Sequence, residues 1–77
     1  MSSFISDYTD LMAAVTVKKD LLTSLKPQIT DQIISEYIDS KIARYNELIN
    51  DYNRKIELAQ YASMHNWSDE NITVFLE

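Results

Sequence analysis

The chain has 77 residues, of which 45% are hydrophobic and 25% charged, and its formal net charge is −5. A chain this short forms one small domain, residues 1–77, because it cannot fill two hydrophobic cores. The acidic balance makes direct binding to nucleic acid unfavourable, and the absence of cysteine and glycine excludes disulfide frameworks, thiolate metal sites and glycine-dependent phosphate loops.

The first expected element is a helix over about residues 3–25. With no glycine and one proline, Pro27, the chain has few places to break, so the sequence predicts an all-α fold. Ser2 or Ser3 can supply the N-cap, and Pro27 disfavours helical geometry at Lys26. Steps of four and three predict one apolar stripe, interrupted by Lys18, that contains Phe4, Tyr8, Leu11, Val15, Leu22 and Leu25.

The second expected helix, over about residues 28–64, has the most regular apolar pattern in the chain. It can begin at Pro27 as a first helical position or after Thr30 as an N-cap. Heptad spacing of this kind is typical of a coiled-coil seam, so we expect an oligomer seam here. The seam, named the Ile/Tyr seam below, contains Ile38, Ile42, Tyr45, Ile49, Tyr52 and Ile56 and continues to Ala59.

The third expected helix is short, over about residues 69–77. Ser68 reads as its N-cap, and Asp69 and Glu70 place negative charge in the first turn, where the helix dipole favours it. Trp67 and Ile72 have the spacing of a hydrophobic staple.

The short connection at Pro27 predicts an antiparallel helical hairpin, with Phe4 near Tyr52. In that register residues 54–64 extend beyond the first helix and expose a second apolar face at Leu58 and Tyr61. We expect the third helix to fold back over this face. So few helices bury little apolar surface, and self-association into a helical bundle is expected to complete the core.

Chemistry-bearing groups are scarce. His65 is the only histidine, so a two-histidine metal site is excluded, and its position suits an interaction with the last carbonyl groups of the second helix. The acidic pair Asp69 and Glu70 lacks the glycine and spacing of a calcium loop. The sequence therefore predicts a protein that is not an enzyme and has no catalytic residues, cofactor or metal.

Aromatic side chains are the best candidates for partner binding, because amphipathic aromatics are enriched at binding hot spots. Tyr45 and Tyr52 are on the seam and are assigned to the core. Tyr37, Tyr61 and Trp67 are the candidate partner-binding residues, although intramolecular packing explains each of them as well, and for Trp67 the staple is preferred.

These patterns predict a cytoplasmic, non-enzymatic protein-protein interaction module that acts as an adaptor, assembly factor or inhibitor. The expected partner is another protein, with homo-oligomerisation and without a membrane. The abundance of Ile, Asn, Lys, Tyr and Asp is common in accessory proteins of phages and mobile elements. The first alternative is an acidic nucleic-acid mimic that blocks a nucleic-acid-binding enzyme. The second is a structural subunit of a larger particle.

Overall fold

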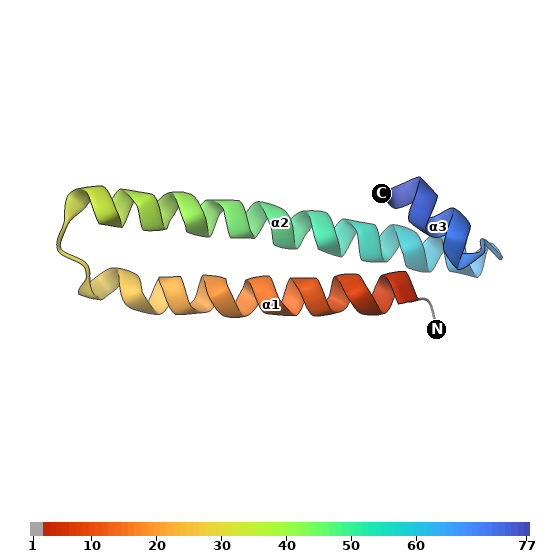
Figure 1. Cartoon of the computed structure of the whole chain (residues 1–77), viewed down its shortest axis with the longest axis horizontal. Coiled ribbons are helices and arrows are strands. Elements are labelled where there is room, and N and C mark those ends of the chain that lie inside the picture. Colours follow the sequence, from red (N-terminus) through yellow and green to blue (C-terminus); the bar gives the residue numbers. More distant parts are fainter. Residues whose placement is uncertain (1–2) are drawn as a thin grey trace.

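The computed structural model describes residues 3–77 and consists of helices joined by short turns. Helix α1 (Ser3–Leu25) leads through a single 3₁₀ turn, η1 (Lys26–Gln28), into α2 (Gln32–Met64), which runs back alongside α1 (Figure 1). A short helix, α3 (Asp69–Leu76), then folds back at the end of α2. The molecule measures 53 × 17 × 14 Å. The predicted all-α hairpin with a short C-terminal helix is confirmed.

Helix α2 begins later than residue 28, where the sequence placed it. Pro27 lies in η1, and Ile29 is extended, so α2 begins at Gln32 and not near residue 28. The N-cap is Asp31, whose Oδ1 accepts a hydrogen bond from the backbone N–H of Ile34 at 2.9 Å. Asp31 displaces the expected cap at Thr30 because an aspartate is the stronger cap and also complements the helix dipole.

The turn between α2 and α3 is a tight reversal at Asn66, which has a positive φ of 65°. The backbone N–H groups of Asn66 and Trp67 donate to the carbonyls of Ser63 and Ala62, both at 3.1 Å. This is the Schellman pattern that satisfies the last carbonyls of a helix, with asparagine in the place that glycine usually takes. As predicted, Ser68 caps α3, since its Oγ accepts from Asn71 N–H at 3.2 Å. At the other end of the chain, the expected cap at Ser2 falls outside the described residues.

The inward face of α1 overlaps the predicted stripe, since Phe4, Tyr8, Val15 and Leu22 are buried or half-buried, but it is rotated at the remaining positions. Leu11, Lys18 and Leu25 are exposed, whereas Met12 and Lys19 are half-buried. Spacing alone could not distinguish the adjacent apolar residues Leu11 and Met12; packing against α2 selects Met12. The buried or half-buried row of α1 contains Phe4, Tyr8, Met12, Val15, Lys19 and Leu22.

The Ile/Tyr seam of α2 is buried or half-buried along its whole length. The ring of Tyr52 meets the ring of Tyr8 at 5.5 Å, and Phe4 packs further along with Ala59. The helices are therefore offset by about one turn from the predicted pairing of Phe4 with Tyr52. Because α2 also begins later than expected, only its final turns extend past α1, and the long overhang over residues 54–64 is not found.

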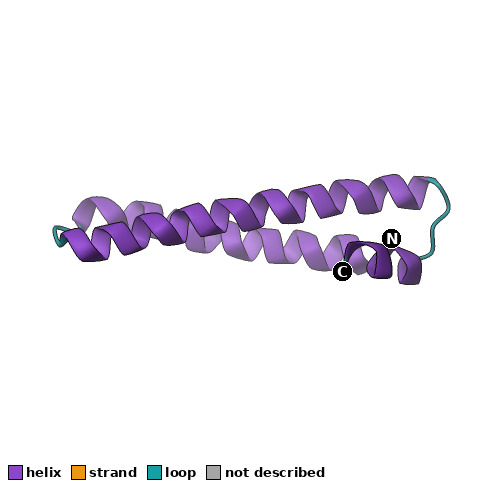
Figure 2. Ribbon diagram, turned by 90° about the horizontal axis from the view of Figure 1, so that it is seen from above, coloured by secondary structure: helices purple, strands orange, loops and turns teal. Residues whose placement is uncertain are grey.

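The main core lies where all three helices meet. It is formed by Phe4 from α1, Ala59 and Ala62 from α2 and Ile72 from α3. The small alanine side chains let α3 approach α2 closely, and Ile72 fills the space between the helices. This end is thus a three-helix arrangement, whereas the rest of the molecule is a two-helix hairpin (Figure 2). Within residues 3–77, no helix combines the length and the apolar character that crossing a bilayer requires.

Candidate binding site

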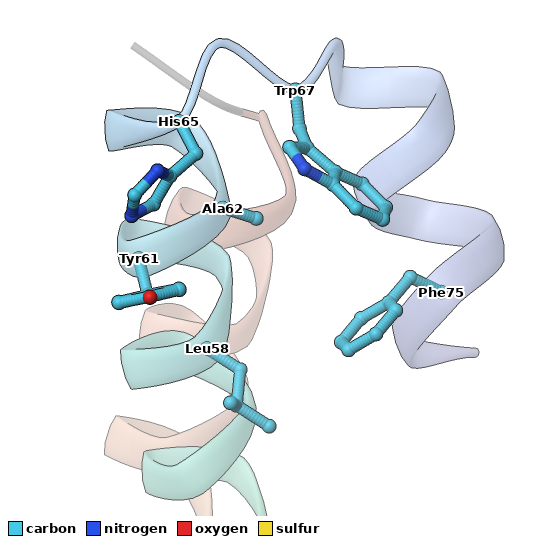
Figure 3. Close-up of a pocket in the computed structure, with 6 residues that line it drawn as sticks. All are labelled: Leu58, Tyr61, Ala62, His65, Trp67 and Phe75. Carbon is cyan, nitrogen blue, oxygen red and sulfur yellow. The ribbon is translucent and has the colours of Figure 1, made fainter.

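A hollow of about 390 Å³ opens between the end of α2 and α3. Its volume is at the small end of the range for ligand pockets. Figure 3 shows side chains from α2 on one side of it and side chains from the reversal and α3 on the other. The residues that line it, named the α2–α3 pocket below, are Leu58, Tyr61, Ala62, His65, Trp67 and Phe75.

The α2 wall of the pocket follows from helical spacing. Leu58, Tyr61, Ala62 and His65 are three, four and seven residues apart and so share one face of the helix. The rings of Tyr61 and His65 lie 4.5 Å apart and are tilted by 45°. Tyr61 is 64% exposed, so the face of this aromatic pair is available to a ligand.

The opposite wall is a second aromatic pair. Trp67 and Phe75 meet edge to face, with ring centroids 5.5 Å apart and planes at 72°, an arrangement that aromatic quadrupoles favour. The left-handed residue Asn66 turns Trp67 towards α3 (Figure 3). The ring of Trp67 thus packs on Phe75, while its expected staple partner Ile72 is enclosed in the core. Trp67 remains 46% exposed.

Tyr8 of α1 contacts Glu77, the residue that follows α3. The Tyr8 hydroxyl donates a hydrogen bond to Oε1 of Glu77 at 3.2 Å, and the Lys55 ammonium lies 5.5 Å from the centre of the Tyr8 ring. Partial burial and, after it, the Glu77 carboxylate raise the pKa of the Tyr8 hydroxyl, while Lys55 acts in the opposite direction. This contact joins α1 to the residue that follows α3.

The chemistry of the pocket is that of recognition. Its walls are apolar and aromatic, and the polar groups among its lining side chains are the Tyr61 hydroxyl, the His65 imidazole and the Trp67 indole N–H. Such a surface receives an apolar or aromatic side chain and can bond a polar group at its edge. Across residues 3–77, no three His, Asp or Glu side chains gather in a way that would hold a metal ion.

The structure brings two of the three candidate binding residues together. Tyr61 and Trp67 line the same pocket, whereas Tyr37 lies at the turn end of the hairpin, about 36 Å away along α2 at 1.5 Å per residue. Tyr37 is 63% exposed. Tyr45 and Tyr52 are half-buried, as their place on the Ile/Tyr seam predicted.

Sequence reasoning did not assign Leu58, His65 or Phe75 to a binding site. The signal for Leu58 and His65 was present, because they share the helical face of Tyr61. For Phe75 the signal was the expected fold-back of the third helix over the face of Leu58 and Tyr61, and the reversal at Asn66 places Phe75 there. Comparison of the chain with known protein families, with curated proteins and with solved structures finds no match.

Proposed function

We propose that this chain is a non-enzymatic protein-interaction module whose α2–α3 pocket receives a large apolar or aromatic side chain of a partner protein. The observation that carries the proposal is the pair of aromatic walls: Tyr61 with His65, and Trp67 with Phe75, face an apolar hollow that is open to solvent. Aromatic residues in preformed, partly desolvated pockets supply a large share of binding energy at protein interfaces.

The preformed geometry suits an adaptor, assembly factor or inhibitor, because a partner would not have to order the pocket on binding. The cap at Ser68, the reversal at Asn66 and the buried Ile72 fix α3 before a partner arrives. We place this activity in the cytoplasm; the cysteine-free composition, which suits a reducing compartment, supports that choice.

Site-specific photocrosslinking in cells of the source organism tests the proposal. A benzophenone amino acid in place of Phe75 is expected to capture a defined partner protein. The same group in place of Val74, which is 82% exposed and does not line the α2–α3 pocket, is the control. Equal capture at the two positions, or no capture at Phe75, would contradict a binding role for the pocket.

Trp67 is the only tryptophan and lines the pocket, so its fluorescence reports occupancy once the captured partner is purified. We expect the emission to change on titration and Phe75→Ala to weaken binding at least about tenfold. If added salt abolishes binding to the partner while Phe75→Ala leaves the affinity unchanged, the result would instead favour the acidic nucleic-acid mimic.

A further inference from the structure

Helix α1 carries a second apolar row that no other part of the described chain covers. Its members are three and four residues apart and so share one side of the helix. This row contains Leu11, Ala14, Lys18, Leu21 and Leu25, all of them exposed. Leu21 is 66% exposed. The inward row of α1 lies beside it, so the second row follows one edge of the groove between the two helices.

Helix α2 supplies the other edge. Ile34 and Tyr37 are exposed, and Lys41 and Leu48 are half-buried. At helical spacing this row also includes the charged residues Arg44, Asp51 and Lys55, and it leads on to Ala59 and Ala62, where α3 packs. The two rows, named the open face below, therefore continue the groove that α3 fills at one end. Figure 2 shows α3 beside that end alone, with the remaining length of the hairpin without a third helix.

The opposite side of the hairpin has a different character. On α1 the hydroxyls of Thr9, Thr16 and Thr23 donate to backbone carbonyls of their own helix at 2.7, 2.8 and 2.9 Å. On α2 the corresponding side is formed by Gln32, Ser35, Asp39, Asn46, Asn50 and Asn53. The two sides of the hairpin therefore differ: exposed leucine, isoleucine and tyrosine side chains gather on the open face, among several charged residues, and contiguous exposed apolar surface of this kind marks an interaction site.

The chain exposes more surface area than a compact monomer of its mass, and the difference can be compared with the size of a protein interface. The chain exposes 5681 Å² at a mass of 9.0 kDa. A compact monomer of that mass exposes about 4,850 Å², so the excess is about 800 Å². This excess belongs to the whole elongated hairpin, and it is comparable to the area, about 800 Å², that each partner contributes to a standard protein interface. The radius of gyration, 16.2 Å, likewise exceeds the value of about 11.5 Å for a compact chain of this length.

We propose that a second copy of this chain covers the open face, with the two hairpins packed face to face about a two-fold axis. If the two hairpins run antiparallel, they form a four-helix bundle over the length in which their open faces overlap. Each α3 then lies at an outer end of the bundle, next to the α1–α2 turn of the other copy. The two-fold arrangement closes the assembly at a dimer. Lys18 and Lys41 extend their aliphatic stems over the apolar surface and keep their ammonium groups at its edge.

This interface is independent of the α2–α3 pocket, because the open face ends where α3 begins. The Ile/Tyr seam is not required either, since α1 already covers it within each chain. A failure of pocket binding therefore leaves the dimer proposal intact, and the reverse also holds.

Adjacent alanines provide a matched test. Ala13 and Ala14 are both exposed in α1, but Ala14 is on the open face and Ala13 is on the far side of the helix. We expect sedimentation equilibrium at micromolar concentration to give twice the 9.0 kDa chain mass for wild type and for Ala13→Glu. Ala14→Glu is expected to raise the dissociation constant at least about 100-fold, because it places a carboxylate in an apolar interface.

Leu21→Glu provides a second test on the same face, and circular dichroism of each variant confirms that the helices remain. A wild-type mass of 9.0 kDa throughout the micromolar range would overturn the proposal. Equal effects of Ala13→Glu and Ala14→Glu would overturn it as well, as would a larger assembly that persists in Ala14→Glu.

Discussion

Ile72 is the one large side chain among residues 3–77 that is completely enclosed, and it comes from the shortest helix. Two turns of helix are unstable alone, so the burial of this side chain against α1 and α2 is what holds α3 in place. The sequence predicted Ile72 on an apolar face, but its full burial depends on the space that Ala59 and Ala62 leave open.

Two aliphatic residues of α3 therefore respond differently to truncation. We expect Ile72→Ala to lower the free energy of unfolding by about 2–4 kcal/mol, through lost burial and a residual cavity. The exposed Val74 in the same helix is the control, and Val74→Ala is expected to change stability by less than about 0.5 kcal/mol. Urea unfolding followed by circular dichroism measures both. Similar losses in the two variants would mean that α3 is not anchored through Ile72.

The hydrogen bond between the Tyr8 hydroxyl and Glu77 makes the stability of the fold depend on pH. Because the pKa of Tyr8 is raised in the folded state, the folded chain keeps this proton at pH values where the unfolded chain loses it. The resulting stabilisation is complete below about pH 10 and is lost as the pH rises through the folded pKa. We expect wild type to lose more stability than Tyr8→Phe between about pH 9 and about pH 11 in urea titrations. Parallel losses would exclude a role for this hydroxyl.

At the scale of the helices, the sequence patterns predicted the presence of each helix more accurately than the residues at which it begins and ends. Ser68 was recognisable as a cap, and the structure confirms it. The start of α2 was placed near residue 28 because Pro27 suits a first helical position, but Pro27 lies in η1. The alternative cap, Thr30, was one residue early, since Asp31 is the residue that accepts from Ile34. The sequence indicated both the break before α3 and the fold-back of this helix, although the residue that makes the reversal is Asn66 and not the glycine that usually takes this position.

The inward face of α1 shows the limit of periodicity. Leu11 and Met12 fit an apolar stripe equally well, as the residues at 18 and 19 are both lysine. The choice is made by contact with α2, whose heptad residues are buried or half-buried along the hairpin. Helix α1 therefore has a second apolar row that does not face α2, and the proposed dimer interface uses this row.

The seam of α2 gives a prediction at this scale. Ile49 is half-buried on the seam, whereas the neighbouring Asn50 is exposed on the polar side of the hairpin. We expect Ile49→Asp to cost several kcal/mol, a large fraction of the stability of a small domain, because it places a carboxylate between α1 and α2. Asn50→Asp makes the same charge change on the surface and is expected to leave the melting temperature nearly unchanged. Comparable melting temperatures for both variants would contradict the packing described.

The molecule as a whole has two parts: one end where α3 packs against α1 and α2, named the filled end, and the remaining two-helix hairpin, named the open length. The filled end, where α3 completes a three-helix core, also creates the α2–α3 pocket. The pocket could not be predicted from sequence because its two walls are joined only through tertiary contact. The open length was foreseen as a need for more core. The proposed dimer places the added contact on the second apolar row of α1, because α1 already covers the Ile/Tyr seam.

Cysteine trapping tests the pairing of open faces most directly, because the natural chain has no cysteine to interfere. Lys18 is at the centre of the open row of α1, which places it close to the proposed two-fold axis, and Asp20 is exposed on the polar side of the same helix. Under mild oxidation we expect Lys18→Cys to form a disulfide-linked dimer rapidly and Asp20→Cys to remain largely monomeric on a non-reducing gel. Equal cross-linking of the two variants, or faster cross-linking of Asp20→Cys, would contradict a dimer built on the open face.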